Sequence, residues 1–178
     1  MLRSSCVRRA VVCLLALLPF APRLARAQSQ RVQVTWIGQA CFVLQEVGSD
    51  FIGPIVVTDP PNANQGYDLP TLPADVVTVT HNHGDHNNVA GIRGVFTLVD
   101  GRPITARSEV AAAGTTFVMI PGFHDNTGGS QRGPNAIIRW TQAGIRFAHF
   151  GDYGQDRLTD QQRSEEHMSE LQSLRHLV

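Results

Sequence analysis

The sequence contains no lysine, so all fifteen of its basic residues are arginines. Fifteen Asp and Glu residues balance them, and the formal net charge is zero. A chain without a basic excess has little to attract the phosphate backbone of a nucleic acid. Aromatic residues make up only 7% of the chain, and no basic stripe interleaved with aromatics occurs. These absences disfavour a nuclease or another nucleic-acid-binding protein.

The sequence also lacks an apolar run long enough for a permanent membrane anchor, which needs roughly 20 apolar residues. Its main apolar run, residues 10–20, follows three arginines and precedes Ala-Arg-Ala at residues 25–27. This layout is typical of a secretory signal peptide, with an uncleaved anchor as the alternative. We therefore predict that residues 1–27 are removed and that the protein is exported, to the periplasm or the extracellular space. Between residues 28 and 162, eight arginines then face twelve acidic residues, a net charge of −4.

Cysteine is scarce, with three residues in the chain. Cys6 and Cys13 fall within the predicted signal peptide, so the mature chain keeps only Cys41 and cannot form an intramolecular disulfide. Cys41 lies in an apolar run, which predicts a buried small hydrophobic residue rather than a nucleophile. No convincing Ser or Cys triad occurs, so the sequence does not indicate covalent catalysis.

Short apolar and β-branched runs, separated by turn residues, occur throughout residues 28–162. They predict strands at residues 31–37, 40–45, 55–58, 75–80, 95–99, 115–120, 136–140 and 145–150. Two short helices are expected, at residues 88–93 and 108–113. Many short strands with few helices favour a two-sheet layered domain. A chain of 178 residues without an internal repeat or a linker has room for one such domain.

Four potential metal ligands follow the expected strand at residues 75–80 within six positions: His81, His83, Asp85 and His86. A single histidine is usually a surface residue or a satisfied core residue. Three histidines and a carboxylate packed together without a cation would compete for protons and lose hydration. A divalent metal removes this conflict, because it accepts neutral imidazole nitrogens and carboxylate oxygens. The segment therefore predicts a metal centre.

The pattern His-x-His-x-Asp-His after a strand is the signature of the metallo-β-lactamase superfamily, which residues 32–162 resemble. Motifs similar to those of its ascorbate-6-phosphate lactonase-like branch follow in the same order: Trp-Ile-Gly-Gln-Ala-Cys-Phe (36–42), Val-Thr-Asp-Pro (57–60), Phe-His-Asp (123–125) and Gly-Asp-Tyr-Gly (151–154). The resemblance implies an α+β fold, an αββα sandwich of two sheets flanked by helices. It also implies a binuclear metal site at one end of that sandwich.

The resemblance assigns roles to individual residues. The first metal would be bound by His81, His83 and His124, the second by Asp85 and His86, and Asp152 would bridge the two. Asp59 would lie behind the ligands and orient them. The alternatives are a plain loop residue for His124 and a turn residue for Asp152, and His149 is expected to be structural. Mixed His and Asp ligands accept two divalent ions of zinc, with manganese or iron as alternatives.

The resemblance further implies a metal-dependent hydrolase. Two cations about 3.5–4 Å apart can share a bridging water and turn it into hydroxide. That hydroxide would attack a small-molecule ester, lactone, amide or phosphoester, and Asp85 would orient the water or pass on a proton. The alternative is a metal-binding protein without turnover, either degenerate or truncated. The sequence indicates no particular substrate or oligomeric state.

The last residues depart from the family pattern. Residues 163–173 resemble the translation of a sequencing-library adapter, with Met168 as the one difference. Family members usually carry a further metal-binding histidine beyond the Gly-Asp motif, and neither His167 nor His176 has matching surroundings. We therefore expect residues 28–162 to be a C-terminally truncated domain and residues 163–178 to be an artefactual tail. A genuine amphipathic helix is the alternative for this tail.

Overall fold

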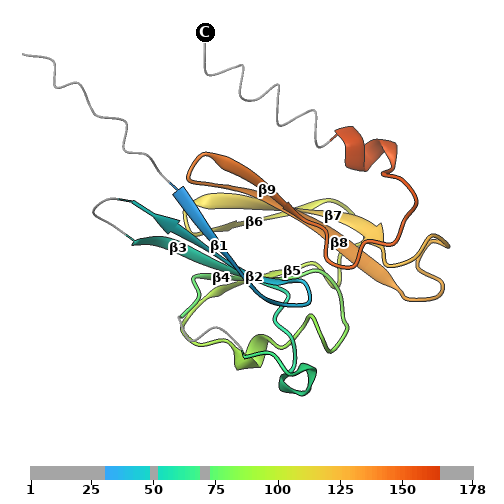
Figure 1. Ribbon diagram of the computed structural model, residues 1–178. Coiled ribbons are helices and arrows are strands. Elements are labelled where there is room, and N and C mark those ends of the chain that lie inside the picture. Colours follow the sequence, from blue (N-terminus) through green and yellow to red (C-terminus); the bar gives the residue numbers. More distant parts are fainter. Residues whose placement is uncertain (1–30, 49–51, 69–72, 165–178) are drawn as a thin grey trace, which may run out of the picture.

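The computed structural model describes residues 31–48, 52–68 and 73–164, which form two β-sheets packed face to face (Figure 1). Within these ranges no helix has the length and apolar character needed to cross a membrane. The predicted signal peptide lies outside the described residues. The same holds for residues 165–178, and so for His167 and His176.

The first sheet contains five strands in chain order: β1 (Arg31–Gly38), β2 (Cys41–Val47), β3 (Ile52–Thr58), β4 (Val76–Val79) and β5 (Thr97–Asp100). Strands β1 to β3 are antiparallel, whereas β3, β4 and β5 are parallel. Parallel strands end at the same edge of a sheet, where α/β proteins commonly bind ligands. Asp59 follows β3 and the histidine segment follows β4, so both lie at this edge.

The second sheet is an antiparallel meander of β6 (Ser108–Ala112), β7 (Thr115–Phe123), β8 (Pro134–Gln142) and β9 (Ile145–His149). Strands β7 and β9 both pair with β8 and therefore run in the same direction. His124 directly follows β7, and Asp152 comes three residues after the end of β9. The two candidate ligands from this half of the chain are thus brought to one end of the sheet.

The main core lies between the two sheets. Its buried apolar side chains come from both: Leu44, Val56, Val76 and Val99 from the first, and Phe117, Met119, Ile138 and Trp140 from the second. The Trp140 ring stacks between Phe117 and Phe147, with centroid distances of 5.4 Å on both sides. Aromatic stacking of this kind adds about 0.5–1.5 kcal/mol per pair beyond burial. The core therefore holds the two layers, and the ends of their strands, in one arrangement.

A second apolar cluster covers the opposite face of the first sheet. Cys41, Val57 and Val77 lie in it, and Ile92 packs onto them from a connecting loop. Because both faces of these strands are buried, they read as continuous apolar runs. Cys41 is fully buried, and burial followed by the charge of Asp59 raises the pKa of its thiol to about 12. The prediction that Cys41 is a buried hydrophobic residue is confirmed.

The expected α+β class is wrong, because strands dominate the described residues. Their helical parts are two 3₁₀ turns, η1 (Ala63–Gln65) and η2 (Val89–Gly91), and a short helix at residues 160–164. The connections around both 3₁₀ turns are rich in Asn, Gly and Pro, which favour turns over helices. The stretch expected to be helical at residues 108–113 is strand β6, because it pairs with β7 along its whole length. The two-sheet layering and all the expected strands are confirmed.

Candidate metal centre

Asp59 connects the ends of β3 and β4. The backbone N–H of Thr80 donates to Asp59 Oδ1 at 2.8 Å, and the Thr80 hydroxyl donates to Asp59 Oδ2 at 2.6 Å. Both residues are completely buried. Asp59 has φ = 37°, a left-handed conformation that non-glycine residues rarely adopt. Such a conformation persists only where the surrounding contacts hold it.

Three imidazoles form the first ligand group. The ligand atoms of His81, His83 and His124 lie within 4.8 Å of one another. His81 Nε2 is 3.1 Å from His83 Nδ1, and the centroid of the His124 ring is 5.0 Å and 4.9 Å from those of His81 and His83. Two of these residues come from the first sheet and one from the second. The group can offer three nitrogens to one cation.

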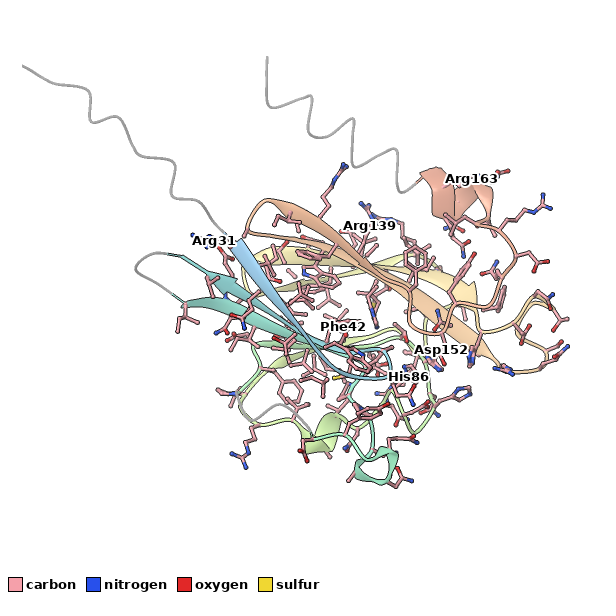
Figure 2. The ribbon with its side chains drawn as sticks, viewed as in Figure 1. Arg31, Phe42, His86, Arg139, Asp152 and Arg163 are labelled. Carbon is pink, nitrogen blue, oxygen red and sulfur yellow. The ribbon has the colours of Figure 1, made fainter. Side chains whose placement is uncertain are left out.

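The second ligand group combines Asp85, His86 and Asp152, whose ligand atoms also lie within 4.8 Å of one another. His86 Nε2 is 3.3 Å from Asp152 Oδ2 and 3.6 Å from Asp85 Oδ2. The same Asp152 oxygen is 3.2 Å from His124 Nε2 in the first group. Figure 2 shows His86 and Asp152 close together where the ends of the two sheets meet. One carboxylate oxygen therefore lies between the two groups.

Asp59 belongs to a third possible grouping with His81 and His86. Its Oδ2 atom accepts a hydrogen bond from His86 Nδ1 at 3.1 Å and lies 3.0 Å from His149 Nε2, in addition to its bond from Thr80. Both carboxylate oxygens are thus occupied within the protein. Asp59 is therefore positioned to orient the His86 and His149 rings that contact it. All seven residues selected from the sequence are brought together at one end of the fold.

Sequence reasoning missed Asn135. It is the second residue of β8, and its side chain is buried beside the ligand groups. Its amide nitrogen donates to the carbonyl of Phe150 at 2.8 Å, and its side-chain oxygen accepts from the N–H of Asp152 at 3.1 Å. Gly151 has φ = 54°, and a Cβ there would collide with Thr80 Oγ1 and Asn135 Oδ1. The signal that could have revealed Asn135 is a polar side chain that begins an apolar strand.

Asp125 organises the loop that follows His124. One of its oxygens accepts from the N–H and hydroxyl of Thr127 and from the N–H of Gly129, at 2.8–2.9 Å. The other oxygen accepts from the backbone N–H groups of Gln131 and Arg132, at 3.0 and 2.8 Å. Burial alone would raise the pKa of Asp125, but these bonds hold it below its usual range. The loop is thereby fixed directly beside a candidate ligand.

The charges of the site favour cations. Burial, with the nearby His86 adding to it, lowers the pKa of His81 to about 4, and burial also lowers that of His124. Both rings are therefore neutral at neutral pH, which is the form that binds metals. Burial opposes the charge on His86 as well, yet the hydrogen bond to Asp59 and the charge of Asp152 raise its pKa. The negative charge that stabilises a proton on His86 would also stabilise a metal ion beside it.

One unsatisfied atom supports this fit. His86 Nε2 is buried and has no hydrogen-bond partner among the described residues, although two carboxylate oxygens lie within 3.6 Å. Buried polar atoms normally have a partner, and a bound ion is one of the recognised partners of an atom that has none within the protein. The donor set of imidazole nitrogens and carboxylate oxygens is the set that zinc takes in proteins. The residues present fit divalent cations.

For protein stripped of metal, we expect the free energy of unfolding to fall as the pH is lowered from 6.5 to 5. In the unfolded chain His81 takes up a proton near pH 6.5, whereas the folded protein takes it up only near pH 4. The unfolded state therefore binds more protons in this window, and stability falls by up to about 1.4 kcal/mol per pH unit for one group. His86, with its raised pKa, acts in the opposite direction only above pH 6.5.

Urea denaturation in EDTA at several pH values would measure this slope. A His81→Gln variant is the control, because it cannot take up the proton and should lose the part of the slope that His81 contributes. The lowered pKa of His124 accounts for the slope that remains. An unfolding free energy that stays constant from pH 6.5 to 5 in the unmodified protein would contradict the expectation.

The sequence was compared with known protein families, and residues 33–170 match the model of the beta-lactamase superfamily domain. The match covers most of the chain and includes every residue of the two ligand groups. The chain belongs to the metallo-β-lactamase superfamily. In this superfamily member the signature histidines and the Gly-Asp motif meet at one end of two packed sheets.

The chain is also similar to a curated protein, a UPF0173 metal-dependent hydrolase of Methanoculleus marisnigri. It is 28% identical over 139 residues, which cover 68% of this chain and 58% of the relative. The chain thus spans somewhat more than half the length of this relative.

Proposed function

We propose that this chain is a hydrolase that depends on two divalent metal ions. Zinc is the preferred candidate, with manganese or iron as alternatives. The observation that carries the proposal is the position of Asp152 Oδ2, which lies 3.2 Å from His124 Nε2 and 3.3 Å from His86 Nε2. One oxygen between two ligand groups suits a carboxylate shared by two metals. The name of the curated relative and the family membership are consistent with this function.

In this proposal each cation has its own ligand group. His81, His83 and His124 would hold the first, Asp85 and His86 would hold the second, and Asp152 would contribute to both. When bound, the metals supply Lewis acidity that activates a water molecule and polarises the attacked carbonyl or phosphoryl oxygen. The buried His81 and His86 rings keep their orientation because their Nδ1 atoms are hydrogen-bonded. His81 Nδ1 bonds to the Thr80 hydroxyl, and His86 Nδ1 bonds to the Asp59 carboxylate. This pre-orientation lowers the cost of assembling the centre.

We assign to Asp85 the role of orienting the attacking water molecule and accepting its proton. Its side chain is 31% exposed, whereas His86 beside it is 1% exposed. A carboxylate at the solvent side of the centre can accept a hydrogen bond from a water molecule, hold it in place and take its proton. General bases of this kind typically contribute about 10²–10⁴-fold to a rate.

The proposed substrate is a small-molecule ester, lactone, amide or phosphoester. The acidic balance of residues 28–162 supports a small molecule over a nucleic acid, because it would repel a phosphate backbone. Export to the periplasm or the extracellular space remains part of the proposal. It is supported by the signal-peptide pattern of residues 1–27, which lie outside the described residues.

We expect the purified protein to bind up to two equivalents of zinc or manganese and to lose them to a strong chelator. The physical reason is the presence of two ligand groups that share one carboxylate. Metal analysis after reconstitution and desalting measures the stoichiometry. A content below half an equivalent would contradict the proposed centre.

Turnover would be tested with a p-nitrophenyl ester, a γ-lactone and bis(p-nitrophenyl) phosphate, before and after chelation. We expect activity on at least one of these classes that disappears with EDTA and returns with zinc or manganese. Stoichiometric metal binding without turnover on all three would favour the alternative, a metal-binding protein without catalysis.

A further inference from the structure

His149 connects the two sheets at the candidate metal centre. It is the last residue of β9 in the second sheet, and its side chain is 10% exposed. Its Nε2 atom lies 3.0 Å from Oδ2 of Asp59, which follows β3 in the first sheet. The two residues are 90 positions apart in the chain. The contact therefore depends on how the sheets are packed.

The Asp59 oxygen contacted by His149 also serves both ligand groups. It accepts directly from His86 Nδ1, and it accepts from the Thr80 hydroxyl, which lies 3.0 Å from His81 Nδ1. An ionised carboxylate only accepts hydrogen bonds, so each of these neighbours must donate to it. The position of this one oxygen thus sets the orientation of one ring in each group.

We propose that His149 is a positioning residue for the metal centre: its Nε2–H donates to Asp59 and holds the carboxylate that orients His86 directly and His81 through Thr80. This inference rests on the proposed metal-dependent function. The ligand groups draw residues from both sheets, since His124 and Asp152 come from the second and the others from the first. Because His149 belongs to the second sheet, its hydrogen bond to Asp59 fixes the position of one set of ligands relative to the other.

The role of His149 is separate from that of a ligand. Its Nε2 is used by Asp59, and no group of potential ligands among the described residues includes it. Thr80 and His86 both lie in the chain segment after β4. Without His149, the side chains of the described residues that donate to Asp59 Oδ2 would therefore all come from that segment. The carboxylate could then turn with that segment, independently of His124 and Asp152.

Two amide variants of the full chain, His149→Gln and His149→Asn, would test the proposal. The amide nitrogen of Gln can take the place of Nε2, whereas that of Asn is one methylene shorter and falls short of Asp59. Zinc affinity would be measured by competition with a chromophoric chelator. We expect His149→Asn to weaken zinc binding by about 10–100-fold, the usual effect of losing a residue that orients ligands. His149→Gln should bind zinc nearly as tightly as the unmodified protein.

Melting of the EDTA-treated variants distinguishes positioning from a general loss of stability. If His149→Asn melts earlier but binds zinc normally, or if Gln and Asn weaken zinc binding equally, the proposal is overturned. If the unmodified protein binds no zinc, the proposed function fails instead. Should His149→Asn not fold, nuclear magnetic resonance of ¹⁵N-histidine-labelled protein decides. The unmodified chain should show a slowly exchanging Nε2–H signal that is missing in His149→Gln, and its absence would overturn the proposal.

Discussion

Replacement of His83 by Ala is expected to reduce hydrolysis roughly a thousandfold or more. His83 contributes one of three nitrogens to the first ligand group, and its removal leaves a coordination position empty. Lewis-acid stabilisation by a metal is worth several kcal/mol, and each ~1.4 kcal/mol corresponds to a factor of ten in rate. Asp59→Asn should cost less, about 10–100-fold, because it disturbs the orientation of the ligands but removes none of them.

Both variants would be assayed with the test substrate that the unmodified protein hydrolyses, and their metal content would be measured. His83→Ala should retain less metal than Asp59→Asn. Asn82→Ala is the matched control, since Asn82 lies next to His83 in the same loop and its side chain is exposed. Equal losses for His83→Ala and Asp59→Asn would contradict the division into ligands and orienting residues.

Replacement of Asp59 by Ala is expected to destabilise the metal-free protein by about 3–5 kcal/mol, as in other buried charge clusters that lose one partner. Burial alone would raise the pKa of Asp59, but the bonds from His149 and His86 hold it well below its usual range. The carboxylate is therefore charged at neutral pH. Its removal leaves the N–H of Thr80 and the donors on Oδ2 without their acceptor.

Asp59→Asn should cost less than Asp59→Ala, because Asn keeps one acceptor oxygen and tolerates the left-handed backbone at φ = 37°. Urea denaturation in EDTA at pH 7 measures both. Asp75→Ala is the comparator, since Asp75 is exposed and its carboxylate accepts a hydrogen bond from the N–H of Ile55 at 2.8 Å. The Asp75→Ala replacement should lower the free energy of unfolding by about 1 kcal/mol. An Asp59→Ala variant no less stable than Asp75→Ala would show that the buried network contributes little.

The strands and the main part of the metal centre were predictable from the sequence for local reasons. Alternating or continuous apolar runs specify strands because successive side chains point to opposite faces. His81, His83, Asp85 and His86 lie on one short loop, so their proximity needs no knowledge of the fold. The stretch at residues 108–113 was harder, since Ser-Glu-Val-Ala-Ala-Ala suits a helix, and pairing with β7 decided for a strand.

The helices of the expected sandwich came from the family resemblance rather than from a pattern of residues. The residues themselves indicated many strands and few helices, and the described structure agrees with that pattern. The resemblance also supplied His124, Asp152 and Asp59 as candidates. Each of them lies more than 20 residues from the nearest part of the histidine segment.

By itself, the sequence determined the layered β architecture and the chemistry of the cluster, because periodicity and short spacing are local properties of the chain. Only the tertiary structure decided that Asp152 Oδ2 lies between the two ligand groups and that His149 reaches Asp59. It also placed the buried Asn135 behind the Gly-Asp turn. These contacts join residues 17 to 90 positions apart, and they form because a shared apolar core brings the ends of two sheets together.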